Sequence, residues 1–343
     1  MDRVFSHLTE AQRVGQLFLV GTASDRAGTL TAATEREYRF GSVLFDANTS
    51  ASSEAIAATT SSIQSLATAT GGVRFFIAAN QEGGQVRNLR GPGFSAMPSA
   101  LVQGSWPAGV LRQRAAAWGR ELRAAGVNLD LAPVMDVVPG GTAARNAPIG
   151  EMDREFGSTA EGNGAHGAAF IAGMASAGVA TSAKHFPGLG RVTGNTDFTA
   201  DVTDPVTVPG DPDLAAFRSA AAAGAPFMMV ALATYPKIDA SRLAVFSPAV
   251  MALLRSSARF GGVIVSDDLG DAKAVASIPA GQRAIQFLSA GGDMITSQSL
   301  PPAETMASAV LARASATPSF RTTVDAAAKR VLAAKQPYRL LPC

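Results

Sequence analysis

Cysteine is almost absent from this 343-residue sequence, which has one, Cys343, at its end. A single cysteine cannot form an internal disulfide, so cysteine usage does not indicate a redox compartment. We interpret Cys343 as an incidental tail residue, because chain ends are usually loosely held. The histidines His7, His166 and His185 lie far apart without metal-ligand spacing. We therefore expect no metal site and no cofactor.

Charged residues are scarce, at 16% of the sequence with a formal net charge of +2 and no Lys/Arg-rich run. Without a basic patch the chain has little electrostatic attraction for nucleic acid, so we expect a small-molecule partner. No stretch reaches the roughly 18–20 apolar residues of a membrane span. The first residues contain no basic region followed by an apolar run and a cleavage site. We expect a cytoplasmic monomer; a secreted or lipoprotein form would require that an export signal has been removed.

Apolar residues are plentiful, at 47% of the sequence, which is enough for a large core. Short β-branched apolar runs recur between longer alanine-rich segments. Several are continuous rather than alternating, which indicates burial on both faces and parallel pairing. We predict about eight strands, at 16–21, 41–47, 74–80, 127–137, 178–186, 226–235, 261–269 and 291–298.

The segments between these strands predict helices. Good helix formers fill 53–70, 111–126 and 159–178. Glycines stand where helices end before strands, at Gly126, Gly178 and Gly224. Strand and helix alternating about eight times predict an α/β fold, a (β/α)8 TIM barrel, with residues 1–343 as a single domain. An open doubly wound sheet is the alternative, but no glycine-rich phosphate loop opens the first helix.

Polar side chains follow the predicted strands at Asp46, Asn80, Asp136, Lys184, His185, Thr234, Asp267 and Ser297. In a barrel these strand ends share one rim, where active sites are built. We interpret Asp46 as structural, because single polar residues at strand ends usually form turns or caps. Several such residues from different strands instead predict a site.

Two of these positions can carry chemistry. In "VIVSDDLGDA", either Asp267 or Asp268 can cap the next helix, or Asp267 can point into the pocket as a nucleophile or cation stabiliser. Lys184 and His185 end a buried strand, where cations are costly unless they meet a ligand or carboxylates. Lys184 could also form a Schiff base. Because neighbours alternate sides along a strand, we expect at most one of the pair to point along the pocket axis.

Six motifs occur in a particular order: "NQEGGQV", "LAPVMDV", "REFGS", "KHFPGLG", "YPKID" and "VIVSDDL". In order and spacing the chain resembles glycoside hydrolase family 3, most closely its single-domain bacterial β-N-acetylglucosaminidases, over about residues 8–300. The resemblance implies the same barrel. It also implies a retaining double displacement on a β-linked sugar at a non-reducing end.

Carried over by position, the resemblance gives roles to individual residues. Asp267 matches the nucleophile of the family. Lys184, His185 and Arg154 match residues that bind the hydroxyls of the sugar, a task that suits side chains with several donors. Glu82, within "QEGG", is interpreted as structural or as a support for these residues.

The chain departs from the family pattern at three places. Asn80 stands where an aspartate is usual, so a charge is lost but hydrogen bonding is kept; we include Asn80 among the substrate-binding residues. Leu232 replaces a usual histidine, which removes a polar group and can alter the pocket. The acetylglucosaminidases also carry an Asp-Ser-His triplet with the acid/base histidine, where this chain has Asn195, Thr196 and Asp197.

The loop must supply another acid/base if the chain is a glycosidase. Arg191 stays charged and cannot transfer the proton. Asp197 occupies the place of the missing histidine and is our candidate, provided that burial or the charge of Asp267 raises its pKa. The alternative is that Asp197 belongs to an ordinary turn with an Asx-type hydrogen bond.

We therefore predict a retaining exo-β-glycosidase that acts through a covalent glycosyl-aspartate intermediate. N-acetylglucosamine is the first expected sugar, from cell-wall muropeptides or chitin in a bacterial setting. A β-glucosidase-like or specialised glycosidase with an altered pocket is one alternative. A catalytically weak sugar-binding protein that keeps the barrel but lacks the acid/base is the other.

Overall fold

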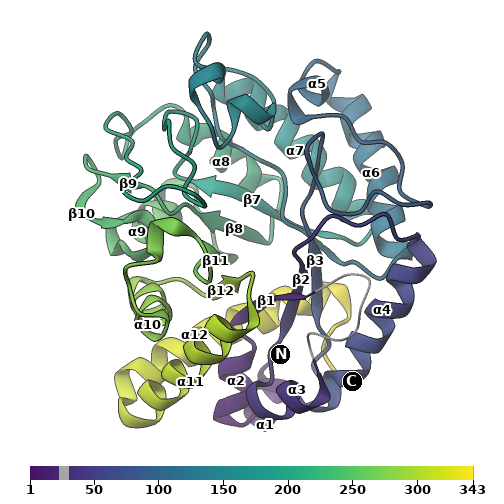
Figure 1. The fold of residues 1–343 in the computed structure, drawn as a ribbon, viewed down its shortest axis with the longest axis vertical. Coiled ribbons are helices and arrows are strands. Elements are labelled where there is room, and N and C mark those ends of the chain that lie inside the picture. Colours follow the sequence, from purple (N-terminus) through teal and green to yellow (C-terminus); the bar gives the residue numbers. More distant parts are fainter. Residues whose placement is uncertain (23–30, 343) are drawn as a thin grey trace.

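The computed structural model describes residues 1–22 and 31–342, so Cys343 lies outside the described residues. Eight parallel strands close into a barrel in the order β1-β12-β11-β8-β7-β6-β3-β2 (Figure 1). They are β1 (Phe18–Thr22), β2 (Ser42–Phe45), β3 (Phe76–Ala79), β6 (Leu129–Asp130), β7 (Ala180–Phe186), β8 (Phe227–Val230), β11 (Val263–Asp268) and β12 (Met294–Ser297). Each lies within or overlaps a predicted strand, which confirms the TIM barrel and rules out the open sheet.

Helices surround this barrel (Figure 1). The described α-helices are α1 (Asp2–His7), α2 (Glu10–Gly15), α3 (Ala32–Tyr38), α4 (Ser53–Ser65), α5 (Ala100–Gly104), α6 (Ala108–Ala124), α7 (Ala160–Ser176), α8 (Leu214–Ala222), α9 (Pro248–Ser257), α10 (Ala280–Ala290), α11 (Leu300–Ala316) and α12 (Pro318–Lys335). The three predicted helices correspond to α4, α6 and α7. Gly126, Gly178 and Gly224 follow helices with φ of 79°, 76° and 86°, which confirms their role at helix ends.

The core lies inside the barrel and between barrel and helices. All four residues of β2 and of β3 are buried, as continuous apolar strands require. Phe76 and Phe227, from different strands, meet edge to face with ring centroids 5.2 Å apart. Outside the barrel, a Cβ on Gly173 of α7 would lie 2.6 Å from the Cβ of Ala115 of α6, so only glycine allows these helices their close approach.

A buried lysine lies at the amino ends of β1 and β2. The Nζ of Lys335 donates to Gln16 Oε1 and to the carbonyl of Gly41, both at 2.7 Å. Burial lowers the pKa of Lys335 to about 7, although the nearby charge of Glu35 opposes this shift. Burial likewise raises the pKa of Glu35 to about 8 against the opposing effects of the Phe40 backbone and Lys335. Lys335 therefore closes this end of the barrel, and the pKa values of Lys335 and Glu35 are both shifted by burial.

The opposite, carboxyl ends of the strands carry irregular structure and two small sheets. These sheets pair β4 (Gln81–Gly83) with β5 (Val86–Arg87), and β9 (Thr234–Tyr235) with β10 (Asp239–Leu243). The predicted strand 127–137 is regular only in β6, and 226–235 divides between β8 and β9. Within the described residues, no helix is long and apolar enough to span a bilayer.

Candidate active site

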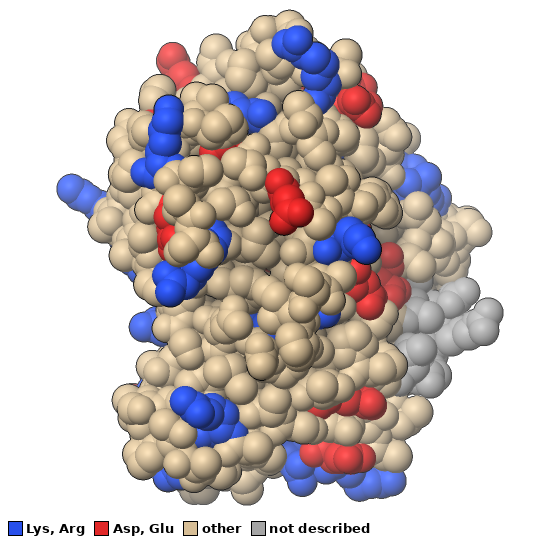
Figure 2. Space-filling view, turned by 60° about the vertical axis from the view of Figure 1, so that its left-hand side comes forward, with Lys and Arg blue, Asp and Glu red and all other residues tan. Residues whose placement is uncertain are grey.

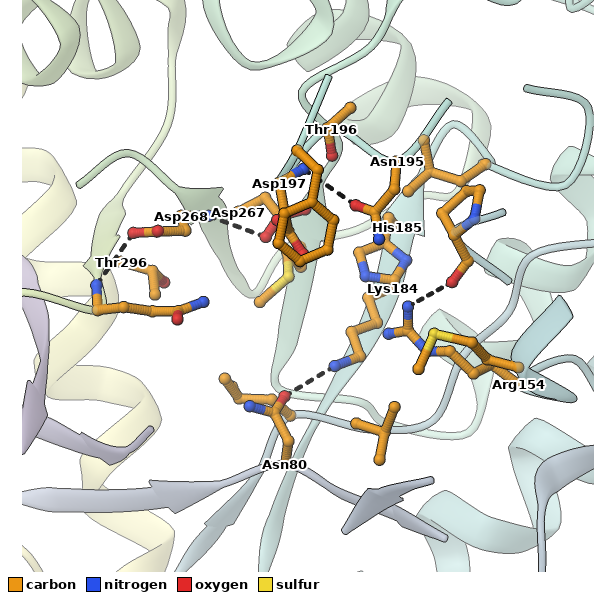
Figure 3. A pocket seen from close by; sticks show the side chains of 18 of the residues that line it. Asn80, Arg154, Lys184, His185, Asn195, Thr196, Asp197, Asp267, Asp268 and Thr296 are labelled. Carbon is orange, nitrogen blue, oxygen red and sulfur yellow. Dashed lines mark hydrogen bonds between the residues drawn. The ribbon is translucent and has the colours of Figure 1, made fainter. Parts of the chain in front are cut away.

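A pocket of about 260 Å³ lies at the carboxyl ends of the barrel strands (Figure 3). The six side chains predicted for catalysis or binding all line it: Asn80, Arg154, Lys184, His185, Asp197 and Asp267. They belong to separate stretches of the chain, so the fold brings them together. Apolar side chains complete the lining, among them Leu44, Val86, Leu131, Pro148, Met152, Leu189, Phe198 and Met229.

Charges on the surface near this end are mixed. Figure 2 shows the molecule from the side on which β9 and β10 lie in Figure 1, and both small strands belong to the connection that follows β8. Lys and Arg side chains are scattered there among Asp and Glu, with other residues between them. A surface without one dominant sign offers no long-range attraction for a highly charged ligand.

Lys184, near the end of β7, contacts two groups from the β3 side of the pocket. Its Nζ lies 2.7 Å from Glu82 Oε1 and donates to Asn80 Oδ1 at 2.9 Å (Figure 3). Only 3% of the lysine side chain and 3% of the glutamate side chain are exposed. An ion-paired ammonium is not a nucleophile, so the geometry favours a binding role for Lys184 over a Schiff base.

Arg154 reaches the same glutamate from the segment after β6. Its Nε and Nη2 donate to the two oxygens of Glu82 at 2.8 Å each, and its Nη1 donates to the carbonyl of Pro148 at 2.7 Å. Burial alone would raise the pKa of Glu82, but the charges and hydrogen bonds of Arg154 and Lys184 outweigh burial and lower that pKa to about 2. Glu82 is thus the anion that holds both cations in the pocket, in agreement with the supporting role expected for it.

His185 is held by Asp136. Nδ1 of the ring lies 2.8 Å from Asp136 Oδ2, while Oδ1 accepts the backbone N–H groups of His185 and Leu189 at 3.2 and 2.8 Å. Because Nδ1 is occupied, Nε2 is the ring nitrogen that remains for a ligand.

Lys184 and His185 both line the pocket, although neighbouring residues of a regular strand point to opposite sides. Strict alternation requires a regular strand. Here the pairing of β7 with β8 shifts register between Ala183 and Phe186. The irregular stretch covers both residues.

The two aspartates that end β11 have separate environments. Asp268 accepts the backbone N–H groups of Gly270, Asp271 and Gln298 at 2.9 to 3.0 Å, so it fixes the turn after the strand. Asp267 is half-buried, and its Oδ1 accepts the backbone N–H of Asp268 at 2.8 Å. Asp268 therefore fixes a turn and does not cap the next helix as predicted, because that helix begins at Lys273 without a side-chain cap. The carboxylate of Asp267 is available to a ligand.

The loop after β7 places Asp197 beside this carboxylate (Figure 3). Asn195 Oδ1 accepts the backbone N–H of Asp197 at 3.0 Å, which is the predicted Asx-type turn. The carbonyls of Thr196 and Asp197 accept the N–H groups of Ala274 and Lys273, both at 3.1 Å. The turn and a pocket-facing Asp197 therefore occur together, and the loop is attached to the segment that follows β11.

The pKa of Asp197 is raised to about 6. Burial is the main cause, and the charge of Asp267 adds to it, whereas His185 and Arg154 oppose the shift. Asp197 as a whole residue is exposed to solvent, so water screens part of these interactions. An aspartate with this pKa can both hold and release a proton near neutral pH.

Two residues singled out in the sequence lie away from the pocket lining. Arg191 forms ion pairs with Asp211 and Asp213, each at 2.6 Å. Leu232 is fully buried and does not line the pocket.

Sequence reasoning missed the roles of Asp136 and Phe198. Asp136 was visible only as one of several polar residues at strand ends. Phe198 directly follows the candidate acid/base as an aromatic residue in a polar loop. Across residues 1–22 and 31–342, no group of three or more His, Cys, Asp or Glu side chains is arranged to hold a metal ion.

Comparison with known proteins gives a consistent set of similarities. Residues 9–334 match the glycosyl hydrolase family 3 N terminal domain. A β-hexosaminidase of Methylococcus capsulatus is 34% identical over 298 residues, which are 81% of this chain and 83% of that protein.

Two solved structures are also similar. A β-N-acetylhexosaminidase from Beutenbergia cavernae is 45% identical with a TM-score of 0.92, over 96% of this chain and 99% of that one. A glycoside hydrolase family 3 β-N-acetylglucosaminidase from Paenibacillus is 29% identical with a TM-score of 0.86, over 97% of this chain and 63% of that one.

Proposed function

The chain belongs to glycoside hydrolase family 3, and we propose that it hydrolyses terminal β-linked N-acetylglucosamine residues with retention of configuration. The observation that carries this proposal is the pair of carboxyl groups, Asp267 and Asp197, that two separate segments bring to one pocket. The names of the similar β-hexosaminidase and β-N-acetylhexosaminidase support the sugar. We include the whole of 1–343 in one catalytic domain.

The sugar would bind through the polar groups on the Asn80 side of the pocket. Lys184 and Arg154 offer charged donors, and Glu82 keeps both in place without needing the ligand. Asn80 offers an amide that can donate, and Nε2 of His185 faces outward from its bond to Asp136. Vicinal hydroxyls need several donors and acceptors at fixed positions, which this set supplies.

The first chemical step would use both aspartates. Asp197, protonated, donates its proton to the glycosidic oxygen as the bond from this oxygen to the anomeric carbon breaks. The Asp267 carboxylate attacks the anomeric carbon and forms a glycosyl ester, while the leaving group departs as an alcohol. The raised pKa of Asp197 suits this role, because a share of the groups then carries the proton near neutral pH.

The second step would reverse these roles. Asp197, now ionised, removes a proton from water, and the resulting oxygen nucleophile attacks the anomeric carbon. The ester bond to Asp267 breaks, the carboxylate is restored and Asp197 regains its proton. Two inversions at one carbon give net retention.

All six proposed residues belong to one chain, which supports a monomer as the active unit.

A panel of nitrophenyl β-glycosides, with N-acetylglucosaminide and glucoside first, tests the function. We expect turnover of the N-acetylglucosaminide, its loss in Asp267→Asn, and full activity in the control Asp201→Asn, an exposed aspartate of the same loop. With the activated substrate, Asp197→Ala should accumulate the glycosyl ester, because water is no longer activated, and intact-mass measurement should detect the added sugar. Sugar binding without turnover of any member of the panel would overturn the proposal in favour of a binding protein.

A further inference from the structure

Phe198 is exceptional among the large apolar side chains of the described residues. It is 81% exposed, whereas the other exposed large apolar residues are one leucine and four valines, with exposures between 37% and 50%. Leaving a phenylalanine in water instead of burying it forgoes about 2 kcal/mol. An exposed aromatic ring at the edge of a pocket therefore calls for something that covers it.

Local disorder of the chain does not account for this exposure. The carbonyl of Asn195 accepts the N–H groups of Phe198 and Thr199 at 3.1 and 2.8 Å, which closes a hydrogen-bonded turn that includes Phe198. Immediately before it, the carbonyl of Asp197 accepts the N–H of Lys273 at 3.1 Å. The backbone on both sides is fixed, so the ring is presented at the pocket and lines it.

The proposed chemistry identifies the leaving group as the part of the substrate that lies near the Phe198 ring. Asp197 protonates the oxygen that joins the terminal sugar to its leaving group, so the leaving group must lie next to Asp197. Phe198 is the adjacent residue and lines the same pocket. We propose that Phe198 is the platform on which the leaving-group sugar binds, with the aromatic ring packed against the C–H face of a pyranose. This inference rests on the glycosidase function proposed above.

Charge and ring chemistry select the class of leaving group. The face of an aromatic ring is partly negative, so it attracts the polarised C–H bonds of a sugar ring. Asp267 and Asp268 line the same pocket and would repel a carboxylate or phosphate held close to them, whereas the cations Arg154 and Lys184 are already paired with Glu82. A neutral pyranose, such as a second N-acetylglucosamine, fits both conditions.

The test compares two substrates that share the terminal sugar. The disaccharide of two β-1,4-linked N-acetylglucosamines places a pyranose over Phe198, whereas N-acetylglucosaminyl fluoride leaves that position without a sugar. In Phe198→Ala we expect kcat/KM for the disaccharide to fall about tenfold, equal to about 1.4 kcal/mol. For the fluoride it should stay within about twofold of wild type. Phe198→Trp should restore the disaccharide value, because it keeps an aromatic face.

Val102→Ala serves as the control, because Val102 is an exposed apolar residue on α5, outside the pocket. Equal losses on both substrates in Phe198→Ala, or no loss on the disaccharide, would overturn the platform. A changed pH profile on the fluoride would also overturn it, since the effect would then act through Asp197. If wild type cleaves neither substrate, the proposed function itself fails, and the two failures are thereby distinguished.

Discussion

Asp136 and His185 form a buried pair in which a carboxylate oxygen lies 2.8 Å from Nδ1 of the ring. The other oxygen of Asp136 accepts the N–H of Leu189, which lies in the loop that follows β7. One carboxylate therefore orients a side chain of the pocket and fixes the start of the loop that carries Asp197.

The first prediction is that Asp136→Asn weakens substrate binding. An amide can present its NH2 group to Nδ1, which would force the proton of a neutral ring onto Nε2 and change what the ring offers the sugar. We expect kcat/KM to fall at least about tenfold, with most of the loss in KM. Steady-state kinetics on the nitrophenyl N-acetylglucosaminide measures this, with exposed Asp153→Asn as control. An unchanged KM would contradict the orienting role.

The second prediction concerns the pH dependence of activity. Because the pKa of Asp197 is about 6, the acid is protonated below this pH and ionised above it. For substrates with poor leaving groups, kcat/KM should fall as the pH rises through about 6. In Asp197→Ala this fall of kcat/KM near pH 6 should disappear, and kcat/KM itself should drop by about 10²–10⁴.

Activated leaving groups need little protonation, so Asp197→Ala should slow their cleavage step far less. A pre-steady-state burst isolates that step from hydrolysis of the intermediate. If both kinds of substrate are slowed equally, or if the fall of kcat/KM near pH 6 persists in the variant, another group supplies the proton.

The third prediction is that Glu82→Gln is costly to folding as well as to binding. Glu82 is the shared anion of Arg154 and Lys184, and removing its charge leaves two buried cations facing each other. We expect the free energy of unfolding to fall by about 3–5 kcal/mol. Urea denaturation measures this. The exposed Glu151→Gln should change it by less than about 0.5 kcal/mol, and a similarly small change in Glu82→Gln would exclude the supporting role.

The fourth prediction concerns stability and pH at the other end of the barrel. Burial raises the pKa of Glu35 to about 8, so the native protein keeps a proton that the unfolded chain releases above about pH 4.5. Stability should therefore fall as the pH rises from about 5 to about 7, by on the order of 2 kcal/mol from this group.

Glu35→Gln should flatten that slope, as followed by urea unfolding at several pH values. Measurements below pH 7 separate this effect from Lys335. The pKa of Lys335 is lowered to about 7, so above that pH its titration makes stability rise with pH, which is the opposite sign. An unaltered slope in Glu35→Gln would show that other groups set the pH dependence.

The barrel was predictable because burial on both faces leaves a direct mark in sequence. Strands such as Phe227–Val230 are apolar without alternation, and glycines such as Gly126 mark the ends of helices. The segment 127–137 was predicted too long, because the apolar residues from Pro133 onward form a connection that bonds to β7 by a single bridge at Val134. Apolar composition alone does not show where hydrogen-bonded pairing stops.

The site was predictable as a set of residues but not as a set of contacts. Chemistry and resemblance pointed to Asp267, Lys184 and Arg154, since each stands in a specific motif. That Glu82 joins the last two, and that Lys184 and His185 both face the pocket, depends on register and on backbone irregularity. These are tertiary properties, and no local pattern in one sequence encodes them.

The two hydrogen bonds from Lys273 and Ala274 to the Asp197 loop link protonation to conformation. Much of the raised pKa of Asp197 comes from burial and from the neighbouring Asp267, and both depend on the loop being docked. If the segment after β11 loosened, Asp197 would become more hydrated and its pKa would fall towards that of a free aspartate. The pH at which the enzyme loses its acid therefore depends on the docking of this loop, so substitutions that weaken the docking should shift it downwards.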